Sequence, residues 1–312
     1  MTPQEKLSVL LFLSVIATIC GLEAFLLARY GLRRLRRRPT KHLLSRPSAV
    51  VLHVLVGIGM LCVLYGYFIE PYWIEVNSLV VRTPKLQSGC FRIVQISDLH
   101  CDRKPRNEER AVRIINDLKP DVIVATGDYL NDTTGRTRLT EMLSDLRAPL
   151  GKFAVNGNFE IDYWPGVDLL AGTGFRLLNG DSVTVTKGSE EIALTGLGLD
   201  RAGAYREVLE TLPNDRFVVF LFHKPDLIED VNGLGIDLYV CGHTHGGQVA
   251  LPGYGALLTF SKFGKKYESG LYRCGGTTLY VNRGLGLEPG PAPQVRFCAR
   301  PEVTVFDILP TP

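Results

Sequence analysis

The sequence predicts an α/β domain that is preceded by two membrane-spanning helices. Two apolar runs of membrane-spanning length occupy the first 70 residues. From about residue 90, short apolar runs alternate with stretches of helical periodicity, an order typical of α/β proteins. The chain has 312 residues, of which 46% are hydrophobic, so it is long enough to form one large domain or two, with an ample core.

Residues 1–70 are predicted to form a transmembrane helical hairpin. Leu7 to Ala28 and Ala49 to Ile69 are almost uninterrupted apolar runs, and each is about long enough to cross a ~30 Å hydrocarbon core. The basic cluster in the connecting residues 29–41 is expected on the cytoplasmic side. The hairpin would then span the inner or plasma membrane twice, with the large domain outside the cytoplasm. A re-entrant or interfacial second segment would instead leave that domain in the cytoplasm.

The formal charge is unevenly distributed along the chain. The net charge is +3, yet residues 1–69 hold nine basic and two acidic side chains, which leaves residues 70–312 with a net charge of −4. The mildly acidic charge of residues 70–312 argues against nucleic acid as the main partner. We expect residues 71–89 to form a linker and an edge strand at about 72–81, and residues 90–312 to form the large α/β domain.

Five predicted strands of this domain end in side chains that can bind metal. The apolar runs 92–97, 121–126, 153–155, 216–222 and 236–241 lead into the segments Asp98-Leu99-His100, Gly127-Asp128, Gly157-Asn158-Phe159-Glu160, His223 and Gly242-His243-Thr244-His245. Because ligands of α/β proteins gather beyond the carboxyl ends of strands, the five ends can converge on one pocket. Four of the six histidines lie at these ends, a segregation that ordinary core or surface histidines would not show.

The candidate metal ligands combine imidazole nitrogens with carboxylate and amide oxygens, and they are Asp98, His100, Asp128, Asn158, His223, His243 and His245. A mixed nitrogen and oxygen set without thiolate suits Mn, Fe or Zn. One carboxylate that bridges two ions would give a two-metal site, with the ions about 3.5–4 Å apart. If His243 and His245 continue a strand, both imidazoles should point to the same face.

With these residues the chain resembles the calcineurin-like metallophosphoesterase superfamily. The matching motifs are Asp98-x-His100, Gly127-Asp128, Gly157-Asn158, His223 and Gly242-His243-x-His245, and they cover about 150 residues. The resemblance implies a four-layer αββα sandwich of two mixed sheets. It also implies that one ion is held by Asp98, His100 and His245, and the other by Asn158, His223 and His243. Asp128 would bridge the two ions, and a metal-bound hydroxide would attack phosphorus in line.

Motifs in the tail resemble the membrane-anchored bacterial branch of this superfamily, among them Gly246-Gly247-Gln248, Asn282-Arg283-Gly284-Leu285-Gly286 and Val295-Arg296-Phe297. The branch includes enzymes of envelope metabolism, one of them a pyrophosphatase that acts on UDP-2,3-diacylglucosamine in lipid A biosynthesis. The resemblance therefore implies hydrolysis of a phosphodiester or pyrophosphate bond, with a lipid precursor as the expected substrate. Arg283 and Arg296 are candidates either for contacts with substrate phosphate or for ordinary salt bridges.

Two alternatives stay open at this point. One is an extracytoplasmic phosphodiesterase or phosphatase of broad specificity, which suits the expected membrane topology better than a UDP-linked, cytoplasmic substrate does. The other is a non-hydrolytic metal-binding membrane protein.

One residue departs from the superfamily pattern Gly-Asn-His-Asp/Glu. Phe159 stands where the pattern has the histidine that protonates the leaving oxygen, and general acid catalysis is typically worth about 10²–10⁴-fold. Either the leaving group has a low pKa and needs little protonation, or another acid serves, the nearest in sequence being Glu160, Asp162 and Tyr163. We expect the catalytic residues to be Asp128, Asn158, His243 and Glu160.

Overall fold

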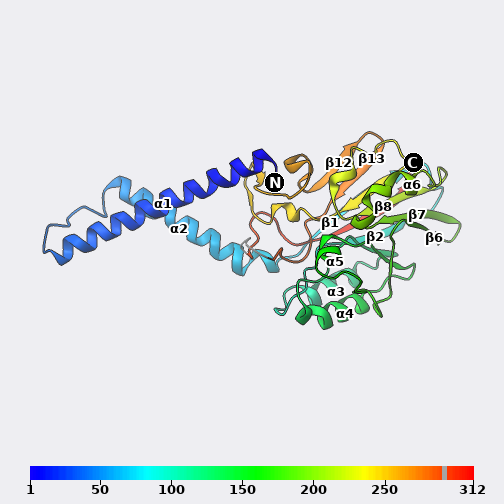
Figure 1. The fold of residues 1–312 in the computed structure, drawn as a ribbon, viewed down its shortest axis with the longest axis horizontal. Coiled ribbons are helices and arrows are strands. Elements are labelled where there is room, and N and C mark those ends of the chain that lie inside the picture. The colour runs from blue at the N-terminus through cyan, green and yellow to red at the C-terminus, as the bar shows by residue number, and fades with distance from the viewer. Residues whose placement is uncertain (290–293) are drawn as a thin grey trace.

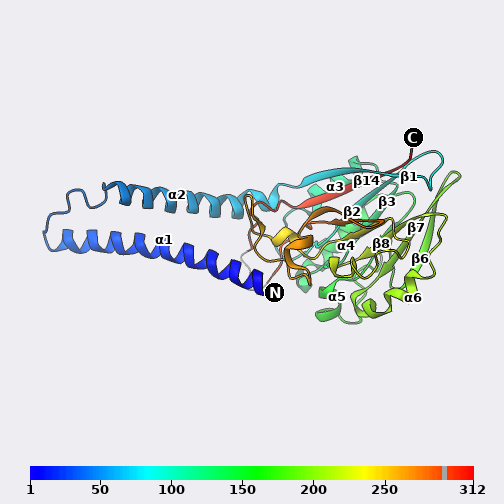
Figure 2. The ribbon, with the colours of Figure 1, turned by 90° about the horizontal axis from the view of Figure 1, so that it is seen from above.

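The computed structural model describes residues 1–289 and 294–312. A long helical hairpin projects from one end of an α/β domain, and the N-terminus lies back against that domain (Figure 1). The hairpin consists of α1 (Pro3–Leu35) and α2 (Pro47–Phe68), and its connecting loop lies at the end far from the domain (Figure 2). Both helices are long and apolar enough to cross a membrane, and most of their large apolar side chains are exposed.

Two pairs of polar residues are joined by hydrogen bonds in the hairpin. Glu23 and His53, which interrupt the two apolar runs, lie together, with the ring Nδ1 of His53 2.8 Å from Oε1 of Glu23. At the start of α1, the Glu5 carboxylate accepts a hydrogen bond from the backbone N–H of Thr2, and the Thr2 hydroxyl accepts one from the N–H of Glu5. This reciprocal capping satisfies backbone donors that the first helical turn leaves without partners.

The domain consists of two six-stranded mixed sheets that pack face to face, with helices on the outer faces. The first sheet has the order β1 (Glu75–Thr83), β14 (Glu302–Pro310), β2 (Phe91–Ile96), β3 (Val122–Ala125), β4 (Lys152–Ala154) and β5 (Phe175–Leu177). The second has the order β12 (Gly270–Cys274), β13 (Thr277–Val281), β9 (Leu238–Cys241), β8 (Phe217–Phe222), β7 (Glu190–Leu197) and β6 (Asp181–Lys187).

Helices complete the expected four-layer αββα arrangement. α3 (Glu108–Asp117) and α4 (Arg136–Asp145) contribute side chains to the core on the outer face of the first sheet. α6 (Tyr205–Leu209) does the same for the second sheet. The short α5 (Asn158–Asp162) follows β4, and β10 (Ala250–Leu251) pairs with β11 (Gly255–Ala256) in a small separate hairpin. The fold class inferred from the sequence is confirmed.

The central strands are continuously apolar because both of their faces are buried. In β8, Phe217, Val219 and Leu221 pack between the two sheets, whereas the alternate residues Val218 and Phe220 pack under the outer helical layer. β8 is parallel to both β7 and β9, and such strands lack the polar face of a half-exposed antiparallel strand. All five strands predicted to lead into metal-binding segments are present, as β2, β3, β4, β8 and β9.

The predicted edge strand is β1, which is an integral part of the first sheet. It pairs in parallel with β14 from Glu75 opposite Glu302 to Thr83 opposite Pro310. The chain therefore enters the sheet within a few residues of the end of α2, and the base of the hairpin is fixed to the edge of the domain.

A buried carboxylate, Glu302, connects the two sheets. It lies in β14 and accepts hydrogen bonds from the hydroxyl of Tyr280 in β13 and from Nδ2 of Asn77 in β1, the latter at 2.9 Å. Arg283 donates to it from Nε at 2.7 Å and also pairs with Glu75 at 2.6 Å. Burial alone would raise the pKa of Glu302, but Arg283 and these donors lower it below its usual value. Arg283 thus forms salt bridges within the fold.

We expect Glu302→Ala to lower the free energy of unfolding by about 3 kcal/mol, because it removes one partner of a buried ion pair and leaves the Arg283 guanidinium poorly compensated. The matched control is Glu191→Ala, whose partner Arg216 is 35% exposed and whose loss should cost less than about 1 kcal/mol. Denaturant unfolding of the full chain in mild detergent measures both. Equal losses in the two variants would contradict this role of Glu302.

Candidate metal centre

The seven predicted ligands come together where strands of both sheets end. Asp98 and His100 follow β2, Asp128 follows β3, and Asn158 begins α5 after β4. From the second sheet, His223 follows β8, while His243 and His245 follow β9. All but Asn158 are buried. The site therefore lies between the carboxyl ends of the two sheets.

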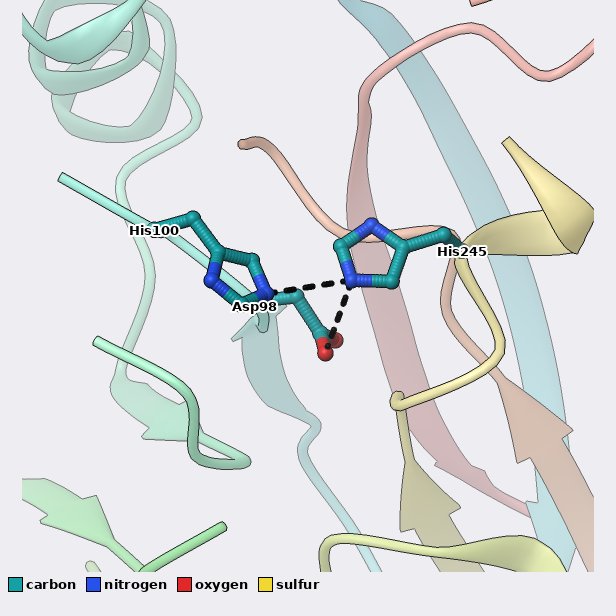
Figure 3. Close-up of side chains that lie close together, drawn as sticks. All are labelled: Asp98, His100 and His245. Carbon is teal, nitrogen blue, oxygen red and sulfur yellow. Dashed lines mark hydrogen bonds and ion pairs between the residues drawn. The ribbon is translucent and has the colours of Figure 1, made fainter. Parts of the chain in front are cut away.

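The side chains form two groups, each with the spacing of a metal site. In the first (Figure 3), Nε2 of His100 and Nε2 of His245 are 3.2 Å apart, and Nε2 of His245 is 3.5 Å from Oδ1 of Asp98. In the second, Nε2 of His223 is 3.2 Å from each of three atoms: Nδ1 of His243, Oδ2 of Asp128 and Oδ1 of Asn158.

These separations fit ligands that surround an ion. Nitrogen and oxygen donors bound about 2.1 Å from a tetrahedral ion are about 3.4 Å from one another. Moreover, two neutral imidazole nitrogens that face each other at 3.2 Å, as those of His100 and His245 do, satisfy each other with at most one proton. A cation between them satisfies both lone pairs.

Asp128 lies between the two groups and has one unsatisfied oxygen. Its Oδ1 accepts a hydrogen bond of 2.9 Å from the backbone N–H of Phe159. Its Oδ2 is buried and accepts no hydrogen bond from any described residue. That oxygen is 3.2 Å from Nε2 of His223 in one group and 3.9 Å from Nε2 of His100 in the other. A buried carboxylate oxygen in this position fits a bridge between two cations.

The ring nitrogen of each histidine that faces away from its group contacts a protein atom, which holds the ring in place. Nδ1 of His100 is 2.6 Å from Oδ1 of Asn131, and Nδ1 of His223 is 2.6 Å from the carbonyl of Thr126. Nε2 of His243 is 3.4 Å from the carbonyl of Phe260, and Nδ1 of His245 is 3.4 Å from Nη2 of Arg296.

Burial and neighbouring charges set the protonation of the centre. Burial holds the pKa of His243 well below its usual range and lowers the pKa of His245 to about 3, so both are neutral, the form that binds metal. Burial alone would also lower the pKa of His223, but the Asp128 carboxylate beside it raises that pKa to about 9. A cation that binds this group therefore displaces a proton from His223.

Backbone strain is concentrated at the ligands. Five of the seven have left-handed φ angles, which non-glycine residues rarely adopt: Asp98 (48°), His100 (43°), Asp128 (56°), His243 (69°) and His245 (52°). The expectation that His243 and His245 continue a strand and point to the same face is therefore wrong. β9 ends at Cys241, and two left-handed residues in a tight turn direct the two imidazoles to different groups.

Two glycines allow the ligand loops to approach each other. A Cβ at Gly242 would collide with the Ser97 hydroxyl and the Asp98 carboxylate, and one at Gly157 would collide with Oδ1 of Asp128. Without a side chain at these positions, the loops of both sheets can bring their candidate ligands together.

Glu160, which we expected among the catalytic residues, binds backbone amides. Its carboxylate accepts hydrogen bonds of 2.8–2.9 Å from the N–H groups of Asp128, Tyr129 and Gly157. Burial, with the nearby Asp128 charge, raises the pKa of Glu160 to about 7. Because its oxygens face these amides, the geometry favours a role in holding the Asp128 and Asn158 loops together over the proton transfer that we expected.

Phe159 forms an apolar wall beside the first group. Its ring is buried and meets the ring of His100 edge to face, with 4.7 Å between centroids, and the centroid of the Tyr163 ring is 4.9 Å away. The other two acids considered from the sequence, Asp162 and Tyr163, are both exposed. The departure from the superfamily pattern is thus a packed aromatic residue next to a candidate ligand.

The sequence interpretation missed Glu288. Its Oε2 is 3.4 Å from Nε2 of His245 and 3.6 Å from Nε2 of His100, within reach of an ion in the first group. The N–H of Glu288 donates a hydrogen bond of 2.8 Å to Oε1 of Gln248, which ties this loop to the histidine turn. No strand precedes Glu288 directly, so the pattern that revealed the other ligands could not reveal this one.

Arg296 lies inside the fold, where its side chain supports a loop. Its side chain is fully buried, and its guanidinium donates to the carbonyls of Gly286 and Ala299. These bonds hold the loop that carries Glu288 and leave the guanidinium out of reach of solvent.

Comparison with known proteins agrees with this geometry. A family model described as calcineurin-like phosphoesterase matches residues 91–247. The uncharacterized metallophosphoesterase YkuE of Bacillus subtilis is 36% identical over 263 residues, covering 79% of this chain and 90% of that protein.

Two further relatives have more specific names. The UDP-2,3-diacylglucosamine pyrophosphatase LpxG of Chlamydia trachomatis is 27% identical over 330 residues, covering 84% of this chain and 97% of that protein. The phosphodiesterase YaeI of Escherichia coli is 28% identical over 254 residues, covering 78% and 92%. With the family match over half of its length and the likeness to YkuE over most of it, this chain is a metal-dependent hydrolase of the calcineurin-like phosphoesterase family.

Proposed function

We propose that this chain is a membrane-anchored phosphoesterase that uses two divalent ions to hydrolyse a phosphodiester or pyrophosphate bond in a lipid-linked substrate. The main support is the position of the metal-binding groups beside the base of the apolar hairpin. The Phe260 carbonyl is 3.4 Å from His243, and the residue before it, Thr259, is hydrogen-bonded to Glu5 in the first turn of α1. If α1 enters a membrane just beyond that turn, the site lies at the height of lipid phosphates.

In this proposal Asp98, His100 and His245 would hold one ion, and Asn158, His223 and His243 would hold the other. Asp128 would contribute its carboxylate to both ions, and Glu288 would add a carboxylate to the first. Mn, Fe or Zn suits these nitrogen and oxygen donors. When bound, such ions polarise phosphoryl oxygens and make water a better nucleophile at neutral pH. The N–H of Phe159 orients Asp128 by holding Oδ1.

The leaving group is inferred from Phe159. A phenyl ring cannot donate a proton, and the adjacent residue in sequence, the buried acid Glu160, is engaged by three backbone amides. A leaving group of low pKa departs readily as an anion and loses little without a general acid. A nucleotide phosphate is such a group, and an alkyl alcohol is not. This favours a pyrophosphate bond, as in UDP-2,3-diacylglucosamine, over an alkyl phosphomonoester.

The second candidate is a phosphodiesterase of broad specificity outside the cytoplasm. It is favoured by the basic loop at the far end of the hairpin, because basic loops stay in the cytoplasm and the domain would then lie outside. A UDP-linked lipid is cytoplasmic, so the side of the membrane distinguishes the two substrates.

Asp128→Ala should abolish binding of both ions and reduce hydrolysis about 10³-fold, because metal charge stabilisation is worth several kcal/mol. The assay compares a UDP-linked lipid with an aryl phosphodiester, with and without chelator, and follows bound metal by elemental analysis. The control Asp181→Ala removes an exposed carboxylate from β6 and should match the wild type. Metal binding by the wild type without hydrolysis of either substrate would favour a non-hydrolytic protein.

Phe159→His should increase hydrolysis of alkyl phosphate esters by about 10²-fold or more, because it restores a proton donor beside the leaving oxygen. Hydrolysis of aryl and nucleotide esters should change little. The measurement is kcat/KM for matched alkyl and aryl substrates. No gain on the alkyl ester would count against the leaving-group argument.

For the second candidate, reporter fusions after residue 90 should locate the domain outside the cytoplasm, as the basic loop predicts. An alkaline phosphatase reporter is active only outside, and a fluorescent or β-galactosidase reporter folds inside. A domain found in the cytoplasm would refute the charge-based topology and support the UDP-linked substrate.

A further inference from the structure

We infer that the first turn of α1 supports the metal centre, with Glu5 as a positioning residue that acts on His243 through the segment Thr259–Ser261. The inference rests on the proposed two-ion site but concerns a different question, which is what holds its second group in place. It gives the apolar hairpin a role in the geometry of the centre as well as in anchoring.

Glu5 contacts the domain through a buried carboxylate, and each of its two oxygens accepts two hydrogen bonds. Its side chain is 1% exposed although α1 is otherwise largely open. Oε1 accepts hydrogen bonds from the backbone N–H and from the hydroxyl of Thr259, at 2.8 and 2.7 Å. Oε2 accepts from the N–H and the hydroxyl of Thr2, at 2.7 and 3.2 Å. A buried charge that accepts four hydrogen bonds fixes its partners strongly.

The residue next to Thr259 is strained and is held from both sides. Phe260 has a φ of 56°, a left-handed conformation that is strained for a bulky residue. Its ring is 50% exposed, so packing of the ring does not explain the conformation. Glu5 fixes Thr259 before it, and Oδ1 of Asp226 accepts from the Ser261 hydroxyl and from the N–H of Lys262 after it. Strain of this kind persists only where neighbouring contacts determine it.

The strained conformation points the Phe260 carbonyl at His243. The oxygen is 3.4 Å from Nε2, and the opposite ring nitrogen, Nδ1, faces the second metal group. A carbonyl at this place selects the tautomer with the proton on Nε2 and the lone pair on Nδ1. The Glu5 carboxylate is therefore separated from a candidate ligand by one dipeptide.

α2 makes a comparable connection to the other histidine of the turn. The carbonyl of Gly66 accepts a hydrogen bond of 2.9 Å from the N–H of Arg296, whose Nη2 is 3.4 Å from Nδ1 of His245. A Cβ on Gly66 would lie 3.0 Å from the Arg296 carbonyl oxygen, so the helix and the loop touch through backbone. Each helix of the hairpin thus meets a segment that contacts one of the two histidines, and the two routes lead to different ions.

The experiment measures Mn²⁺ binding to the full chain in detergent or nanodiscs, by titration followed by electron paramagnetic resonance. Glu5→Ala should weaken one of the two Mn²⁺ sites about tenfold or more, since loss of outer contacts to a ligand typically costs 10- to 100-fold in affinity. The other site should keep its wild-type affinity. Glu5→Gln retains an oxygen for Thr259 and should restore most of the loss.

The matched control is Glu23→Ala, which removes a carboxylate from the same helix that contacts His53 of α2. It should leave both affinities unchanged. Thr259→Val, which removes only the hydroxyl donor, should weaken the same site as Glu5→Ala and should have a smaller effect when Glu5 is already alanine.

Equal weakening of both sites by Glu5→Ala, unchanged affinities in that variant, or an equal effect of Glu23→Ala would overturn the inference. If the wild type binds no Mn²⁺ at all, the proposed two-ion centre itself fails. The wild-type titration therefore separates failure of the proposed function from failure of this inference.

Discussion

The centre is organised around the carboxylate of Asp128, whose two oxygens have opposite environments. Oδ1 is held by the N–H of Phe159, and Oδ2 is buried without a hydrogen bond from any described residue. Among the described side chains its charge is compensated by the His223 ring, whose Nε2 is 3.2 Å away, and a cation at that place would satisfy it equally. The backbone of Asp128 is itself fixed through Glu160, which also holds Tyr129 and Gly157. The loops of the first sheet are thus arranged to keep one oxygen available to metal.

The sequence predicted the strands and most of the centre for a simple physical reason. Parallel strands buried on both faces are recognisable as short apolar runs, and the polar residue that ends each run lies at one edge of its sheet. That argument does not extend to conformations set by tertiary contacts. The separation of His243 from His245 depends on left-handed residues after β9, and the approach of Glu288 depends on an irregular loop. Neither the turn nor the loop produces a periodic pattern in the sequence.

The tertiary contacts of the hairpin could not be predicted from the sequence either. In the sequence, Glu5 is only an acidic residue ahead of an apolar run, and Glu23 and His53 are only polar residues within the two apolar runs. In the structure, Glu5 binds Thr259, which is distant in sequence, and Glu23 pairs with His53 across the two helices. Such contacts join segments that no local pattern relates. Because the domain binds the hairpin at Glu5 and at Gly66, the hairpin and the metal-binding groups form a continuous structure.

The four domain histidines further constrain the chemistry. Each has one ring nitrogen directed at a metal group and the other against a protein atom, namely Asn131, Thr126, Phe260 or Arg296. None has a nitrogen left to protonate a leaving oxygen, and Phe159 places a phenyl ring beside His100. Substrates whose leaving group departs as a stable anion avoid this requirement. If these residues bind two ions as proposed, the same arrangement would therefore disfavour alkyl esters.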